Sequence, residues 1–286
     1  MLNNTEKYIE EFLSHLKYIK RRADSTIKEY RKILNSYKAY IDEMGINKIA
    51  FLKYLEDNSK LSKRTIRLRV VVIRSFLNYL YENQYIDGIQ YWKDAYTESP
   101  NQVPKGLTED QLEIIFKHIS KNEYDKNFFG LLLKIGLRIS EALNLKRENF
   151  IVHKNYAEII VNGKGSKERI LKISFDYAKN ILSLTDTFIF DKLLKNKIVP
   201  TSRTMQRRFK KYVQISNEEI KKMNENGANI NLINATPHAL RHTCAKKLLN
   251  SGKNIEEVRY ILGHTSIQTT GIYLRSEQHT SLLDEI

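Results

Sequence analysis

The sequence predicts a mainly α-helical protein with one small antiparallel β-sheet, arranged as an N-terminal helical bundle followed by a mixed α/β domain. Apolar residues recur at helical spacing along most of the 286 residues. Residues 156–174, YAEIIVNGKGSKERILKIS, instead hold two β-rich runs around a glycine-containing turn, which is typical of a hairpin. Two of the four prolines lie in the polar stretch KDAYTESPNQVPKG, so residues 94–106 are predicted to link a domain at 1–93 to one at 107–286.

The first domain is predicted to be a bundle of four or five helices. Segments with apolar residues at helical spacing are found at 5–20, 24–45, 46–58 and 62–87. The second of these begins with Asp24 and Ser25, residue types that cap helix N-termini, and it ends at Gly45. With 41% apolar residues, the chain can bury a core in each of two domains.

The second domain is predicted to be helical apart from the hairpin. Helical segments are expected at 107–120, 127–136, 137–149, 201–214, 236–252 and 254–263, with a further one starting at Ser266. Two helix starts have the spacing of a capping box, Thr108 with Gln111 and Asn254 with Glu257. Thr236 and Pro237 form a favourable N-cap and first-turn pair for the segment at 236–252. The polar stretch 216–234 is interpreted as a connection before it.

The chain is strongly basic, with a net charge of +15. Residues 1–100 hold 18 basic and 13 acidic side chains and the remainder holds 30 and 20, so both parts favour a polyanionic partner such as nucleic acid or an acidic membrane face. The single cysteine, Cys244, cannot form an internal disulfide, which fits a reducing compartment. The N-terminus lacks the pattern of a signal peptide, and the most apolar segment, FFGLLLKIGL, is too short to span a bilayer. We therefore expect a cytoplasmic protein, and the family resemblance described below implies that it associates with the nucleoid and not with a membrane.

Two helical segments carry clusters of basic residues that could contact DNA phosphates. In the first, Ser62 and Thr65 add hydroxyl donors near the helix start, where anions bind favourably. Either cluster could equally be a solvated helix face. The residues predicted to bind DNA are Lys63, Arg64, Arg67 and Arg74 in the first segment, and Arg203, Arg207 and Arg208 in the second.

Six residues in the second domain suit the cleavage of a phosphodiester. Two guanidinium groups can hold the non-bridging oxygens and neutralise charge in the transition state. A tyrosine oxygen, with an ordinary pKa of about 10, can attack phosphorus when a base or a cationic pocket assists it. A hairpin lysine can give a proton to the leaving 5′ oxygen, and no metal ion or other cofactor is needed. The candidate catalytic residues are Arg138, Lys164, His238, Arg241, His264 and Tyr273.

The segments that hold these residues resemble the ordered motifs of the tyrosine recombinase family, the phage-integrase and Xer group. They are GLRISEALNL, NGKGSKERI, TPHALRHT and LGHTSIQTTGIY. The gaps of 23 residues from Arg241 to His264 and of nine residues to Tyr273 are similar to the Xer pattern. The N-terminal helices also resemble the family's SAM-like core-binding domain. The resemblance covers nearly the whole chain.

The resemblance implies a role for each of these residues. Tyr273 would be the nucleophile that forms a 3′-phosphotyrosine. Arg138 and Arg241 would hold the scissile phosphate, and Lys164 would be the general acid. His238 would assist proton transfer with the tyrosine, His264 would hydrogen-bond the phosphate, and Glu141 would orient the arginines.

The resemblance also implies partners and an assembly. The protein would bind double-stranded DNA at an inverted-repeat core site, as a homotetramer that could include a second recombinase, and would exchange strands through a Holliday junction. No arm-type DNA-binding module is expected before the core-binding helices. Leu282, Leu283 and Ile286 would dock on a neighbouring subunit or pack on their own chain. The setting stays open between Xer-like dimer resolution, transposon cointegrate resolution and integration of a mobile element.

Three alternatives remain from the residues themselves. His238 and His242 are four residues apart and Cys244 is near, a spacing that can bind zinc, although Ala239 replaces the glutamate of a zincin helix. A non-catalytic DNA-binding protein could share the fold. A type IB topoisomerase would use the same chemistry without exchange between two sites.

Overall fold

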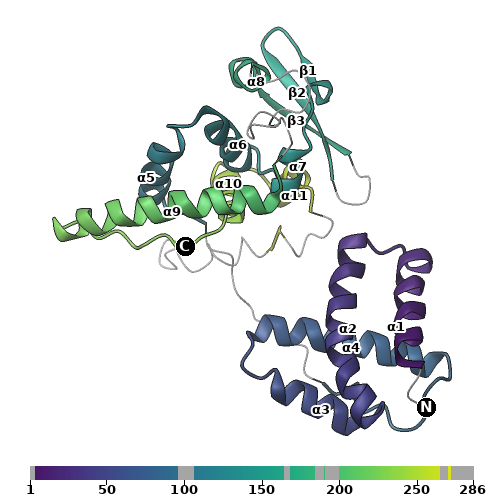
Figure 1. The fold of residues 1–286 in the computed structure, drawn as a ribbon. Coiled ribbons are helices and arrows are strands. Elements are labelled where there is room, and N and C mark those ends of the chain that lie inside the picture. Colours follow the sequence, from purple (N-terminus) through teal and green to yellow (C-terminus); the bar gives the residue numbers. More distant parts are fainter. Residues whose placement is uncertain are drawn as a thin grey trace, which may run out of the picture. The chain divides into compact units, whose positions relative to one another are not determined.

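The structure is a computed structural model that describes residues 4–95, 106–163, 168–183, 190, 200–264 and 270–271. The chain divides into two compact units, Met1–Gln102 and Val103–Ile286 (Figure 1). Most of the predicted linker at 94–106 lies outside the described residues. None of the helices in the described parts of the chain combines the length and apolar character that crossing a membrane requires.

The first unit is a helical bundle, as predicted. Its elements are α1 (Thr5–Ser14), the π-helix η2 (His15–Ile19), α2 (Asp24–Met44), α3 (Lys48–Asp57) and α4 (Lys63–Glu82). Apolar side chains at helical spacing on α1, α2 and α4 form its core, because each helix buries one face against the others. Trp92 is buried in this core, and its indole N–H donates a hydrogen bond to Asn78 Oδ1 at 2.6 Å.

The second unit surrounds its own core with helices. They are α5 (Glu109–Ile119), α6 (Glu123–Lys134), α7 (Ile139–Leu143), the 3₁₀-helix η3 (Arg147–Asn149), α8 (Phe175–Leu182), α9 (Ser202–Glu225), α10 (His238–Asn250) and α11 (Ile255–Leu262). The two predicted capping boxes, Thr108 with Gln111 and Asn254 with Glu257, are confirmed. Together with the sheet, these helices confirm the predicted fold class.

A three-stranded antiparallel sheet, in the order β1-β2-β3, forms one edge of this unit (Figure 1). The strands are β1 (Phe150–Val152), β2 (Tyr156–Asn162) and β3 (Glu168–Ser174). The hairpin of β2 and β3 was predicted, whereas β1 was not. Alternate residues of β3 are buried, and Arg169 is among them. The tip of the hairpin, 164–167, lies outside the described residues.

Some details differ from the sequence prediction. The bounds of several predicted helices differ, and the helix expected at 137–149 is divided into α7 and the short η3. The polar stretch 216–234 is helical up to Glu225, because Ser216 and Ile220 continue the buried face of α9. Helix α10 begins at His238 with Pro237 at its N-cap and without a side-chain cap, so Thr236 lies one residue too early to serve as the cap. The last two differences lie at helix ends, where local spacing says least about where a helix stops or starts.

Candidate active site

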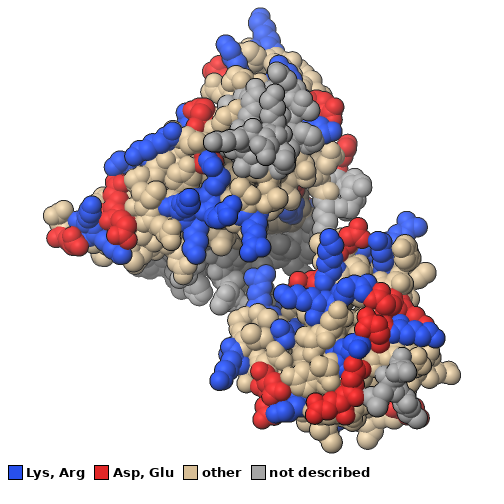
Figure 2. Space-filling view, in the orientation of Figure 1, with Lys and Arg blue, Asp and Glu red and all other residues tan. Residues whose placement is uncertain are grey.

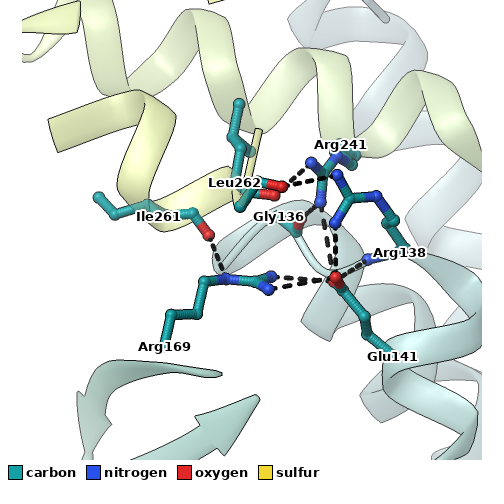
Figure 3. Close-up of polar contacts among 8 residues, drawn as sticks. Gly136, Arg138, Glu141, Arg169, Arg241, Ile261 and Leu262 are labelled. Carbon is teal, nitrogen blue, oxygen red and sulfur yellow. Dashed lines mark hydrogen bonds and ion pairs between the residues drawn. The ribbon is translucent and has the colours of Figure 1, made fainter. Parts of the chain in front are cut away.

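A buried glutamate, Glu141, organises the charged residues of the second unit (Figure 3). It lies in the first turn of α7, and its side chain is 4% exposed. Its Oε2 accepts a hydrogen bond from the backbone N–H of Arg138 at 2.8 Å. This contact fixes the carboxylate at the start of α7, where the positive end of the helix also favours a negative charge.

Three arginines from different elements point at this carboxylate (Figure 3). Arg138, at the N-cap of α7, donates from Nη1 to Oε1 at 2.6 Å. Arg169 of β3 donates from Nη1 and Nη2 to the two oxygens at 3.1 and 2.9 Å. Arg241 of α10 places Nη1 3.8 Å from Oε2. The carboxylate therefore joins residues that are far apart in the sequence.

The same arginines hold the carbonyl groups at the end of α11, and Arg241 also holds the carbonyl of Gly136, which follows α6. Arg169 Nε donates to Ile261 O at 2.9 Å, and Arg138 Nη2 donates to Gly263 O at 2.8 Å. Arg241 donates from Nη2 to Leu262 O, and from Nη1 to Gly136 O at 2.5 Å. These carbonyls lie where a helix lacks internal partners and carries partial negative charge, so cations bind there favourably.

Two glycines permit this close arrangement. Gly136 has φ +68° and Gly263 has φ +62°, a left-handed backbone that glycine adopts without strain. A Cβ at Gly263 would lie 2.8 Å from Arg169 Nη1, and one at Gly136 would lie 2.5 Å from a methyl carbon of Leu262. The glycines of the GLR and LGH motifs therefore let the chain pass against the arginine cluster.

The electrostatics of the cluster favour a bound anion. Burial alone raises the pKa of Glu141, but the hydrogen bonds and charges of Arg169 and Arg138 outweigh burial and lower the pKa to about 2. Glu141 is therefore ionised at neutral pH. Three guanidinium groups share this one carboxylate, so the cluster keeps a surplus of positive charge. An anion such as a phosphate would complement that surplus.

Three histidines lie beside the arginines. The rings of His238 and His242 meet edge to face with centroids 4.5 Å apart. His264 Nδ1 lies 2.9 Å from the hydroxyl of the buried Thr270. Burial and neighbouring charges lower the pKa of His238, that of His242 to about 4 and that of His264 to about 3. All three are therefore neutral at physiological pH, and a neutral imidazole can accept a proton.

The structure thus brings together Arg138, Glu141, His238, Arg241 and His264, which the sequence singled out from separate segments. Their catalytic roles stay predictions. Lys164 and Tyr273 lie outside the described residues, as does the C-terminal segment with Leu282, Leu283 and Ile286. Sequence reasoning missed Arg169. The signal was its inward position on β3, where Leu171 and Ile173 follow at alternate positions.

The predicted DNA-binding arginines differ in their surroundings. Lys63 and Arg64 of α4 and Arg203 and Arg207 of α9 are exposed. Figure 2 shows basic side chains gathered over the first half of α9. Arg208 instead holds the fully buried Asp125, with Nη2 2.6 Å from Oδ2, and this contact ties α9 to α6.

The remaining DNA-binding candidates, Arg67 and Arg74, are partly buried on α4, where Arg74 Nη1 donates to Ala95 O at 3.3 Å. The DNA-binding assignments stay predictions. For the zinc alternative, no three histidine, cysteine, aspartate or glutamate side chains among the described residues lie close enough together to hold a metal ion.

In a basic, mainly helical protein, several arginines held together by a buried carboxylate suit the binding of a phosphate group, as in proteins that act on nucleic acids. Comparison with known proteins makes this specific. Residues 105–279 match the model of the phage integrase family, and residues 9–84 match the phage integrase N-terminal SAM-like domain. The chain belongs to the phage-integrase family, the tyrosine recombinases, which are site-specific recombinases that act on DNA. The family expected from the motifs is confirmed.

Relatives match nearly the full length of the chain. A tyrosine recombinase of Agathobacter rectalis is 31% identical over 292 residues, covering 95% of this chain and 92% of the relative. A tyrosine recombinase XerC of Oceanobacillus iheyensis is 26% identical over 289 residues, with coverage of 95% and 92%.

Two crystal structures share the fold. One is the XerH recombinase bound to a palindromic difH substrate, with a TM-score of 0.70, 18% identity and coverage of 100% of this chain and 98% of that one. The other is a lambda integrase dimer bound to a core site, with a TM-score of 0.74, 14% identity and coverage of 97% and 78%.

Proposed function

We propose that this protein cleaves and rejoins duplex DNA at specific sites through a covalent bond between Tyr273 and a 3′ phosphate. The observation that carries the proposal is the arginine cluster, in which Arg138 and Arg241 approach one buried carboxylate, Glu141, from different helices. Guanidinium groups that are fixed before the substrate binds can stabilise the charge that develops on phosphate oxygens. Family membership supplies the reaction class.

In the proposed reaction the phenol oxygen of Tyr273 attacks phosphorus as the bond to the 5′ oxygen breaks. His238 takes the phenol proton, and its lowered pKa makes it a neutral base at physiological pH. Lys164 gives a proton to the leaving 5′ oxygen, while His264 hydrogen-bonds the phosphate. The phosphotyrosine bond retains the energy of the cleaved linkage, so the 5′ hydroxyl of a partner strand can attack it without a nucleotide cofactor.

The two arginines would meet the phosphate in different ways. The Arg138 side chain is 32% exposed, so a phosphate can reach it directly. The Arg241 side chain is 1% exposed, so a phosphate can reach it only after the groups that cover it move. We therefore expect DNA binding to change hydrogen exchange around the start of α10, and unchanged exchange there would argue against a phosphate contact for Arg241.

The assembly follows by analogy with similar proteins. The XerH structure holds a palindromic difH substrate, and the lambda integrase structure is a dimer on a core site. We propose that this chain binds an inverted-repeat core site and exchanges strands through a Holliday junction within a tetramer, alone or with a second recombinase. Dimer resolution, cointegrate resolution and element integration all fit this chemistry.

A covalent-trapping experiment tests the proposed function. Footprinting on the DNA that flanks its gene should first reveal a protected inverted repeat with a spacer. A duplex with that repeat and a nick beside the scissile phosphate should then yield a protein–DNA adduct. Tyr273→Phe should abolish the adduct and retain binding, whereas Tyr156→Phe, which alters an exposed tyrosine of β2, should leave both unchanged.

The outcomes separate the alternatives. Binding by the wild type without any adduct would overturn the proposal in favour of a non-catalytic DNA-binding protein. An adduct together with relaxation of supercoiled DNA, but without exchange between two sites, would favour a topoisomerase. An adduct that persists in Tyr273→Phe would disprove the assigned nucleophile.

The basic face of α9 has its own test. Arg203 and Arg207 are exposed there, so each should contact backbone phosphates if α9 faces DNA. A plot of log affinity against log salt concentration has a negative slope, and replacing either arginine with alanine should make that slope less steep by about 0.9. An unchanged slope in both variants would remove α9 from the proposed interface.

A further inference from the structure

The end of α11 is attached to strand β3 by two neighbouring side chains. Tyr260 of α11 accepts a hydrogen bond from the backbone N–H of Ile170 at 3.1 Å, and its hydroxyl donates to the carbonyl of the same residue at 3.4 Å. One residue away on each element, Arg169 Nε donates to Ile261 O at 2.9 Å. The two elements therefore meet at consecutive positions in both segments.

The Tyr260 hydroxyl forms the hydrogen bonds to the outer edge of β3 that a neighbouring strand would otherwise form. Among the strands that the structure describes, β3 pairs only with β2, so backbone groups on its other edge need partners from another element. A phenol hydroxyl can accept and donate, so it can satisfy both groups of Ile170. Tyr260 is 54% exposed, and its ring therefore gains little from burial. Its main structural contribution is the placement of α11.

The attached end of α11 presents the carbonyls that orient the arginine pair. Leu262 O accepts from Arg241, and Gly263 O accepts from Arg138 at 2.8 Å. Arg169 also lies close to this helix end, since a Cβ at Gly263 would lie 2.8 Å from its Nη1. Any displacement of α11 along β3 would move both acceptors relative to the phosphate site.

We propose that Tyr260 and Arg169 are positioning residues that lock the end of α11 onto β3 and thereby set the geometry of Arg138 and Arg241. This proposal rests on the proposed function, in which those two arginines hold the scissile phosphate. Arg169 contacts both groups that position Arg138. Besides its hydrogen bond to Ile261 O, it donates hydrogen bonds from both terminal nitrogens to Glu141, the carboxylate that Arg138 also binds. These contacts therefore fix the α11 carbonyls and the Glu141 carboxylate relative to each other.

The test compares Tyr260→Phe and Arg169→Lys with the wild type in single-turnover adduct formation at saturating DNA. Tyr260→Phe removes one hydroxyl, and the matched control Tyr156→Phe removes one from β2 of the same sheet. We expect adduct formation to slow roughly 5-fold in Tyr260→Phe and roughly 30-fold in Arg169→Lys, with DNA affinity unchanged, since small misplacements of catalytic groups cost rate. The control should match the wild type.

A second substrate shows whether the lock acts through the arginines. A methylphosphonate at the scissile position carries no negative charge, so its reaction depends less on guanidinium groups. On this substrate both variants should come within roughly 3-fold of the wild type on the same DNA. Equal defects on the two substrates would overturn the proposal, as would a Tyr260→Phe rate equal to that of the wild type.

These outcomes differ from a failure of the proposed function. If the wild type forms no adduct on its footprinted site, the recombinase assignment fails and the lock falls with it. The wild type could instead form an adduct while the variants show a lower melting temperature but an unchanged rate of adduct formation per folded molecule. In that case the positioning role alone is refuted, and the two residues only stabilise the fold.

Discussion

Replacing Glu141 with glutamine should destabilise the protein in a manner that depends on pH. The substitution keeps the shape of the side chain and removes the charge that three arginines share. Removing one partner from a buried ion cluster leaves uncompensated charge, which commonly costs about 3–5 kcal/mol. The Glu141 side chain is 4% exposed, so solvent does little to screen that loss.

The pKa of Glu141 gives an independent value for the same loss. The pKa falls from an ordinary 4.5 to about 2 in the folded state. At about 1.36 kcal/mol for each pKa unit, the ionised carboxylate contributes about 3 kcal/mol at pH 7. Because the folded pKa is depressed, this contribution is complete above pH 5 and is lost as the pH falls toward 2. Integrating the linkage relation leaves about 2 kcal/mol at pH 3.5.

Urea unfolding of the wild type and Glu141→Gln across pH 3.5 to 7 measures this difference. Other carboxylates titrate in both proteins, so their effects cancel in the comparison. Glu256→Gln serves as the control, because Glu256 is 56% exposed and pairs with Arg259, and such pairs contribute at most about 1 kcal/mol. A gap below about 1 kcal/mol at pH 7, or a gap that does not narrow with acid, would refute the central role of Glu141.

Three other predictions follow from single sites. Gly263→Ala should cost about 1 kcal/mol more than Gly252→Ala, since both glycines have positive φ but only the first would press a Cβ against Arg169, and urea unfolding checks this. Asp125→Asn should lower the unfolding free energy by about 2–4 kcal/mol by breaking a buried ion pair, and an unchanged midpoint would contradict that role. Burial raises the pKa of the Cys244 thiol to about 12, so iodoacetamide at pH 8 should label it only after unfolding, as mass spectrometry can show.

Local sequence patterns predicted the helices well because their signals are local. Apolar spacing gave the helical bundle, and the capping boxes of α5 and α11 lie at the predicted residues. The site residues Arg138, His238, Arg241 and His264 came from motif order, which carries information that periodicity lacks. The approach of Arg138 and Arg241 to one carboxylate depends on tertiary packing, which motif order does not describe.

The missed features are those that depend on distant partners. Strand β1 has three residues, too few for an alternating pattern to be recognised. Arg169 could have been found by following the alternation of β3, since an arginine at an inward position needs a buried partner. The contact of Tyr260 with Ile170 joins residues 90 positions apart, and no local pattern announces it.

The proposed function would explain why a recombinase buries a carboxylate among several arginines. Guanidinium groups held close together repel one another, and burying them without a counterion is costly. Glu141 offsets that repulsion, and the carbonyls at the end of α11 accept further N–H groups of the three arginines, so each arginine is held before DNA arrives. A single carboxylate leaves part of the positive charge uncompensated, and a phosphate can supply the remainder. Replacing the cluster with apolar residues could make the fold more stable, but it would remove the fixed charges that the proposed reaction uses to stabilise its transition state.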